Sequence, residues 1–148
     1  MKKNLKREII LITAMMSLFL FSGCGLKLGE EYTEEVNTLK GVVLTVDGDS
    51  VTHGELTYTI SNQSDKDLSY GQDYGLQKEK EGKWYQIIPK NEVAVTLELL
   101  WVPAGNTDTQ MLGWESSYGK LPAGHYRIVK SVFDDQQGYY LAGEFQVE

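Results

Sequence analysis

The sequence Leu-Pro-Ala-Gly-His-Tyr-Arg-Ile at residues 121–128 carries the most specific structural signal in this chain. Gly124 lies two residues before Tyr126, and Tyr126 opens a run of apolar and β-branched residues near the C-terminus. This is the layout of a tyrosine corner, in which the phenol folds back to hydrogen-bond a backbone group upstream and fixes the crossing between two sheets. Gly124 and Tyr126 therefore predict a structural tyrosine corner in a two-sheet protein.

From residue 41 onward, short runs rich in Val, Ile, Thr and aromatic residues alternate with clusters of Gly, Pro, Asn and Asp. This pattern is typical of strands joined by turns, and helix signals are rare. The expected strands lie at residues 42–46, 55–61, 68–79 with a break near 71, 84–88, 93–101, 109–118, 126–133 and 139–147. We expect 93–101, which alternates most regularly, to be the best core strand. An all-β antiparallel sandwich of seven to nine strands with Greek-key connections is predicted.

Length and composition narrow the class of protein. The chain has 148 residues, of which 41% are apolar and 24% charged, as in one globular domain. Its 14 basic and 21 acidic residues give a net charge of −7, which argues against a nucleic-acid partner because such a partner needs a basic face. A single cysteine excludes an internal disulfide and a zinc site built from cysteine pairs.

The N-terminus has the pattern of an export signal. Residues 1–7 carry four positive charges, and residues 9–21 are apolar apart from one Thr and one Ser. Thirteen helical residues reach only about 20 Å, against roughly 30 Å of hydrocarbon, so a permanent membrane span is disfavoured. A signal that is cleaved from the mature chain fits better.

The end of this signal, Leu-Phe-Ser-Gly-Cys at residues 20–24, resembles the lipobox of bacterial lipoproteins. The resemblance implies cleavage between Gly23 and Cys24, lipidation of Cys24 with acyl chains such as palmitate, and attachment to the membrane through that lipid. The alternative is an ordinary secretory signal followed by a chance cysteine. Removing residues 1–23 leaves 10 basic and 20 acidic residues, a net charge of −10.

The predicted domain organisation has three parts: a lipoprotein signal peptide at 1–23, a lipidated cysteine and acidic tether at 24–40, and a β domain at 41–148. Residues 25–40 contain four glutamates and show no strand period. As a flexible tether they would reach about 20–25 Å. The domain is therefore expected to work close to the membrane.

Four stretches of the β region resemble the bacterial Ig-like domain found in small lipoproteins of Gram-positive bacteria. They are residues 62–66, 70–74, 82–85 and 121–130, and the resemblance covers about 41–148. It implies an immunoglobulin-like β-sandwich. Ile128 stands where an immunoglobulin domain has its second disulfide cysteine, so apolar packing is expected to join the sheets. These motifs are structural, and a shared fold does not carry a function with it.

Candidate catalytic groups are few. The two histidines, His53 and His125, are expected in exposed loops, and no nucleophile, phosphate or dinucleotide motif accompanies them. Three acidic pairs fall in predicted turns, where aspartate is common, and lack the further ligands of a calcium loop. These pairs are Asp47 with Asp49, Asp65 with Asp67, and Asp134 with Asp135. No enzyme activity, cofactor or metal is predicted.

Aromatic residues are the candidates for recognition. The chain beyond residue 23 has nine Tyr, three Trp and two Phe, and Tyr is well suited to binding surfaces. Trp84 with Tyr85, and Tyr139 with Tyr140, are neighbours in predicted strands, so one of each pair is expected to be exposed. These four residues are the predicted binding surface, although strand propensity alone also explains tyrosines on an outer face.

Together these patterns predict a non-catalytic, lipid-anchored Ig-like domain on the extracytoplasmic face of the cell membrane. It would act as a binding or accessory module for an envelope protein. One alternative is a carbohydrate-binding module whose exposed aromatics stack on cell-wall glycans. A third hypothesis, an envelope hydrolase built on acidic loops, would need two carboxylates roughly 5–9.5 Å apart at a cleft.

Overall fold

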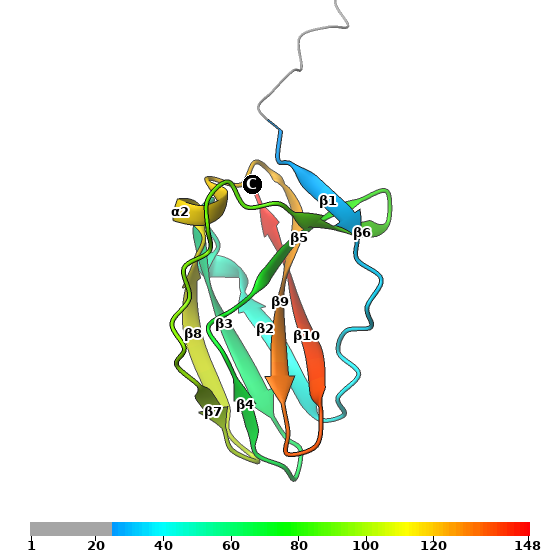
Figure 1. Cartoon of the computed structure of the whole chain (residues 1–148), viewed down its shortest axis with the longest axis vertical. Helices are drawn as coiled ribbons and strands as arrows, with labels where there is room; N and C mark the ends of the chain where they lie inside the picture. Colours follow the sequence, from blue (N-terminus) through cyan, green and yellow to red (C-terminus); the bar gives the residue numbers. More distant parts are fainter. Residues whose placement is uncertain (1–24) are drawn as a thin grey trace, which may run out of the picture.

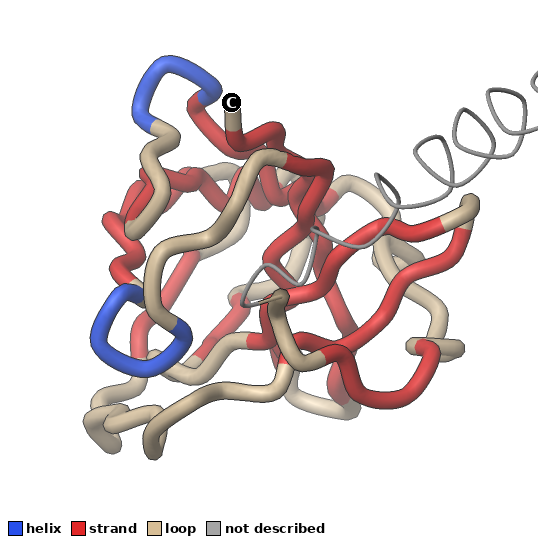
Figure 2. The backbone as a smooth tube through the Cα atoms, turned by 90° about the horizontal axis from the view of Figure 1, so that it is seen from above, coloured by secondary structure: helices blue, strands red, loops and turns tan. Residues whose placement is uncertain are grey.

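The computed structural model describes residues 25–148, which form two antiparallel sheets packed face to face (Figure 1). The strands are β1 (Leu28–Glu31), β2 (Val42–Asp47), β3 (Glu55–Asn62), β4 (Leu68–Tyr70), β5 (Gly75–Lys80), β6 (Lys83–Ile87), β7 (Leu100–Val102), β8 (Thr107–Gly113), β9 (Gly124–Phe133) and β10 (Gly138–Val147). A 3-10 turn, η1 (Gly48–Ser50), and a short helix, α2 (Glu115–Tyr118), complete the elements. The helical turns lie at the periphery of the strands (Figure 2).

The smaller sheet has the order β2-β3-β8. Alternate residues of β3 face the core, as the period-two pattern predicts, and Leu56, Tyr58 and Ile60 are all buried. The opposite face carries threonines in register across the three strands, with Thr59 paired to Thr45 on one side and to Thr109 on the other. One face of this sheet is therefore apolar and buried, and the other is hydroxyl-rich.

The larger sheet is organised around β9. Its order is β1-β6-β5-β9-β4-β7. β5 and β4 pair with one edge of β9, and β10 pairs with the other edge of β9. The N-terminal half of β9 pairs with β5 and its C-terminal end with β4. The β5-β6 hairpin turns at Glu81 and Gly82, both with positive φ (55° and 77°), as in the tight turns that join antiparallel strands.

The core lies between the two sheets and is apolar, without any cysteine among the described residues. Trp114 is fully buried at its upper end, where its ring packs 5.6 Å from that of Phe145 and its indole N–H donates to the His53 carbonyl. All buried apolar residues fall within 42–147. The prediction of an immunoglobulin-like β-sandwich is confirmed, with ten strands in place of seven to nine.

The prediction for residues 93–101 is wrong. Only Leu100–Val102 forms a strand, and residues 93–99 run outside the sheets beside β8 (Figure 1). Similarly, residues 109–118 divide into the end of β8 and helix α2. Alternation reports β propensity but not the presence of a pairing partner, and β7 obtains only a three-residue pairing with β4.

The tether prediction is also wrong for part of residues 24–40. Leu28–Glu31 forms β1, an edge strand paired with β6, and the residues after it follow the edge of the sandwich to β2. The strand had no visible period because it is short and contains a register shift. The signal peptide, the cleavage site at Gly23 and the lipidated Cys24 lie outside the described residues. Among the described helices, none is long and apolar enough to cross a membrane.

Candidate functional site

The four aromatic residues singled out from the sequence do not lie on one face. Trp84 and Tyr140 are on the outer face of the larger sheet, whereas Tyr85 and Tyr139 point the opposite way, Tyr139 against the core. Trp84 and Tyr85 are both half-buried, and Tyr140 is 41% exposed. Tyr140 packs edge-on against Tyr32, with the ring centroids 6.4 Å apart. Of these four side chains, only Tyr140 is exposed, and its ring is partly covered by Tyr32.

The buried side chain of Arg127 stacks on one face of the Trp84 ring. The Arg127 guanidinium carbon lies 4.4 Å from the centroid of Trp84 and 5.4 Å from that of Tyr32, and Arg127 Nε donates to Gln77 Oε1 at 2.7 Å. Burial lowers the Arg127 pKa, and the two aromatic faces stabilise its charge. In the described part of the chain, the Tyr32 hydroxyl and Gln77 Nε2 have no hydrogen-bond partner. This arrangement fixes β1 and β6 onto β9 and leaves one face of Trp84 covered.

The tyrosine-corner residues form the expected contact. The Tyr126 hydroxyl donates to the carbonyl of Pro122 at 2.7 Å, four residues upstream. Its ring is fully buried and stacks on Phe145, with centroids 5.7 Å apart. Gly124 lies under the phenol, since a Cβ there would meet the Tyr126 oxygen at 3.3 Å. Burial raises the pKa of Tyr126 to about 12, so its hydroxyl remains a donor throughout the physiological range.

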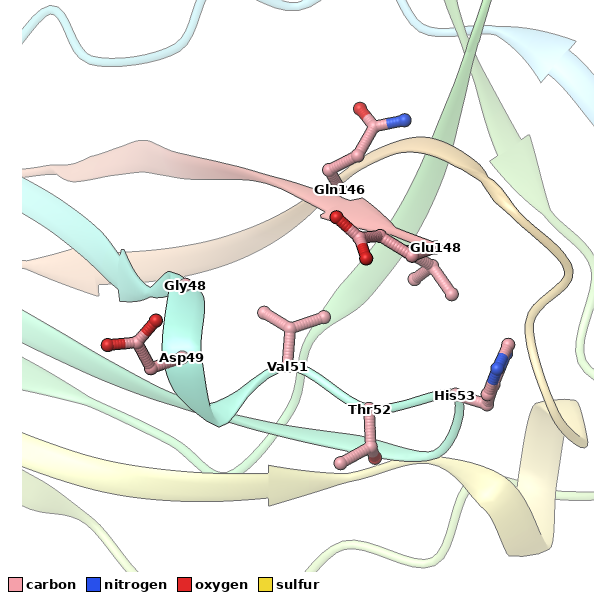
Figure 3. Close-up of a pocket in the computed structure, with 8 residues that line it drawn as sticks. Gly48, Asp49, Val51, Thr52, His53, Gln146 and Glu148 are labelled. Carbon is pink, nitrogen blue, oxygen red and sulfur yellow. The ribbon is translucent and has the colours of Figure 1, made fainter.

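The two histidines have structural contacts. His53 Nδ1 lies 2.7 Å from the carbonyl oxygen of Leu121, and Figure 3 shows its ring directed toward the segment that precedes β9. The ring of His125 packs 5.2 Å from that of Trp84, and its Nε2 lies 3.0 Å from Glu144 Oε2. Neither ring is placed beside a serine, threonine or cysteine side chain among these contacts.

One aspartate of each acidic pair stabilises a turn or loop by accepting backbone N–H groups. Asp47 caps η1 by accepting the Asp49 N–H, and Asp67 accepts the Ala104 N–H at 2.9 Å. Asp134 accepts the N–H groups of Gln136 and Gln137, both at 2.8 Å, and these hydrogen bonds lower its pKa. Among residues 25–148, no three His, Cys, Asp or Glu side chains are grouped so as to hold a metal ion.

A hollow of about 500 Å³ lies between η1 and the end of β10 (Figure 3). Its acidic groups are Asp49 and Glu148, one from each border, with Val51 between them. The imidazole of His53 borders it but is held by Leu121. Thr52 also lines the hollow, and its hydroxyl oxygen accepts the backbone N–H groups of Gly54 and Glu55 at 3.1 and 3.0 Å.

Sequence reasoning missed the most exposed apolar side chains, which belong to residues 93–101 and their surroundings. Leu97 is fully exposed, and Trp101, Met111 and Phe133 are 61%, 72% and 48% exposed. Residues 93–96 and Met111 border a hollow of about 540 Å³ beside β8. The alternating pattern of residues 93–101 was the only signal available for this region. It predicted buried apolar side chains, whereas several of these side chains are exposed.

The comparisons with known proteins give a family and weak structural likenesses. The family described as bacterial Ig-like domain matches residues 38–146. No curated protein matches the chain in sequence. An alkylpurine DNA glycosylase from Pseudomonas fluorescens, solved bound to DNA containing an abasic site analog, is 15% identical with a TM-score of 0.36, over 73% of this chain and 30% of the glycosylase. A PapD-like domain of human CEP192 is 7% identical with a TM-score of 0.37, over 81% of this chain and 96% of that domain. The family match spans most of the chain, so this protein belongs to the bacterial Ig-like domain family.

Proposed function

We propose that this protein is a non-catalytic, lipid-anchored accessory domain on the outer face of the cytoplasmic membrane, and that it binds another envelope protein through residues 93–99. Bacterial Ig-like domains are generally non-catalytic and are typically found at the cell surface, where they suggest binding or accessory roles. The observation that carries the protein-binding proposal is the unpaired, apolar segment 93–99.

Residues 93–99 have the composition of a strand but no strand partner within 25–148. Val95, Leu97 and Leu99 alternate along it, and all three side chains are exposed. In the described sheets β8 pairs with β3 on one side, and residues 93–99 run along its other side (Figure 1). Exposed apolar surface of this kind marks protein-binding sites, and a strand from a partner can pair with such a segment or with the edge of β8.

The test is site-specific crosslinking in native membranes. A photo-crosslinking residue at position 97 is expected to capture one discrete protein, while the same residue at Thr45, exposed on the smaller sheet, captures none. Adding Leu99→Asp should abolish capture from position 97 without changing the circular dichroism spectrum, because Leu99 is an exposed residue. Equal capture from positions 45 and 97, or capture that survives Leu99→Asp, would contradict the proposal.

The lipid anchor is supported by the basic N-terminus, the apolar stretch and Cys24. β1 begins at Leu28, so three residues separate Cys24 from the folded domain, a reach of roughly 14 Å when extended. An anchored domain would then lie directly against the bilayer. Cys24→Ser should abolish incorporation of a labelled fatty acid and release the protein from membranes, whereas an unlabelled wild-type protein that stays in the membrane would exclude this anchor.

A further inference from the structure

Two exposed aromatic rings flank one serine on the outer face of the larger sheet. Ser69 in β4 pairs with Trp101 in β7 on one side and with Phe133 in β9 on the other. The three side chains therefore share one row and one face, with the aromatic residues two strands apart. Because Ser69 is small, the row forms a trough with two aromatic walls and a hydroxyl floor. These residues line a hollow of about 360 Å³.

The width of this trough suits one saturated ring. Two interstrand spacings separate the walls by roughly 10 Å at the backbone. A six-membered ring of sp³ carbons that makes a carbon–carbon contact of roughly 4 Å with an aromatic ring on each face needs about 8 Å between them. Such a ring therefore fits with room for its equatorial substituents to reach the rim.

The ring of Phe133 rests against the neighbouring strand β10. Gly138 is its partner in β10, and a Cβ on Gly138 would come within 2.8 Å of Phe133 Cε1. The ring thus lies over the glycine backbone, which no other residue type would permit without a shift. An aromatic ring that is already ordered loses little conformational entropy when a ligand stacks on it.

The rim offers both donors and acceptors, and each of its three carboxylates already has a donor, although with one lysine its formal charge is −2. Lys66 Nζ lies 3.3 Å from Asp135 Oδ1 and 3.5 Å from Asp134 Oδ2. Asp134 also accepts two backbone N–H groups, and Asp67 accepts the Ala104 N–H. Every carboxylate at the hollow therefore has a donor. A cationic ligand would meet the Lys66 ammonium and an anionic ligand three carboxylates, whereas neutral hydroxyls can both donate and accept here.

We propose that the hollow between Trp101 and Phe133 binds one neutral pyranose ring of a cell-surface glycan. The ring stacks between the two aromatic side chains, and its hydroxyls bond to Lys66 and Asp135. This end of the sandwich is opposite to the end at which the chain enters β1 (Figure 1). This orientation rests on the proposed lipid anchor. In a chain anchored at Cys24, the hollow faces away from the membrane and toward the cell wall.

Titration of the full chain, purified in detergent, tests the site without depending on the anchor or on a protein partner. Trimers of N-acetylglucosamine and of glucose are the neutral probes, and glucosamine and a lysine-rich peptide are the cationic ones. At least one neutral trimer is expected to bind with a dissociation constant in the millimolar range. The binding is monitored by changes in the NMR chemical shifts of the backbone amides in β4 and β9. Trp101→Ala and Phe133→Ala should each weaken binding about tenfold.

Val43→Ala is the matched control, since Val43 is 53% exposed on β2, outside the hollow, and its substitution should leave binding unchanged. All three substitutions are at exposed positions, so the folded spectrum should persist and report on the site alone. The proposal is overturned by an absence of binding to both neutral trimers, by binding that neither aromatic substitution weakens, or by a preference for the cationic probes.

Discussion

Asn37 forms hydrogen bonds with Ala142, 105 residues later in the sequence, in the same way as a residue of a neighbouring strand would. Asn37 Nδ2 donates to the Ala142 carbonyl at 3.2 Å, and the Ala142 N–H donates to Asn37 Oδ1 at 2.9 Å. The Asn37 backbone N–H also donates to the carbonyl of Tyr140. Asn37 thus bonds to the edge of β10 that faces away from β9, and an edge covered in this way is protected at these residues against pairing with other chains.

Replacing Asn37 separates this hydrogen bonding from the backbone conformation, because Asn37 has a φ of 59°. Asn37→Gly keeps that conformation accessible and loses both side-chain hydrogen bonds, so it should lower the free energy of unfolding by about 1–2 kcal/mol. Asn37→Ala loses the same hydrogen bonds and adds left-handed strain of roughly 1 kcal/mol. Urea unfolding of both variants measures the difference; an alanine variant as stable as the glycine variant would contradict the strain.

A second relationship concerns a lysine in the core. Lys130 is 1% exposed, and its Nζ donates to the carbonyls of Gly71 and Asp73 at 2.8 and 2.6 Å. The ammonium lies 5.2 Å from the ring centroid of Tyr70 and 5.8 Å from that of Tyr58. It thereby holds the connection between β4 and β5 against the core. Burial lowers the pKa of Lys130 to about 8.

This pKa predicts a pH dependence with a definite sign. Between about pH 8 and pH 10.5 the unfolded chain keeps the Lys130 proton while the folded protein loses it, so stability should rise with pH. The gain from about pH 7 to pH 9.5 is at most roughly 2 kcal/mol. Above about pH 10 the trend reverses, because the folded state raises the pKa of several buried tyrosines and the unfolded state does not. Those raised to about 12 are Tyr58, Tyr74 and Tyr126.

Melting temperatures measured between about pH 7 and pH 9.5 test this assignment. Lys130→Met keeps a side chain of similar length without the charge, and should remove the rise with pH. Lys120→Met, at an exposed lysine, should retain it. A rise of equal size in the Lys130→Met protein would show that another group is responsible.

The elements that sequence analysis predicted correctly depend on local pattern. Alternation found β3, and the interval between the expected strands at 68–79 and 84–88 coincides with the β5-β6 turn, because residues close in the chain determine both. The errors arise where a distant residue decides. Residues 93–99 alternate without a strand to pair with, and β1 is a strand only because β6 lies beside it. The trough at Ser69 depends on two strand pairings that no local pattern reports.

The tyrosine corner supplies a third prediction. Tyr126→Phe removes the 2.7 Å hydrogen bond to Pro122 and leaves the ring stacked on Phe145. We expect the free energy of unfolding to fall by about 1 kcal/mol, since one hydrogen bond is lost without a cavity. Tyr139→Phe is the control: its hydroxyl lies 3.4 Å from Asp134, and its loss should change stability by less than about 0.5 kcal/mol. Equal effects of the two substitutions in urea unfolding would refute a special role for Tyr126.

Gly143 allows β10 to pack closely against β2, and this contact closes one side of the sandwich. A Cβ on Gly143 would clash with Leu44 Cδ2 and would lie 3.1 Å from Val46 Cγ2 and 3.4 Å from the Leu44 carbonyl oxygen. Because the backbone oxygen cannot move independently of β2, Gly143→Val should lower the free energy of unfolding by about 1–3 kcal/mol. At Gly113 in β8 an added Cβ meets nothing within 4 Å, so Gly113→Ala should change it by less than about 0.5 kcal/mol. If both variants unfold at the wild-type urea concentration, the two sheets are not held together at this point.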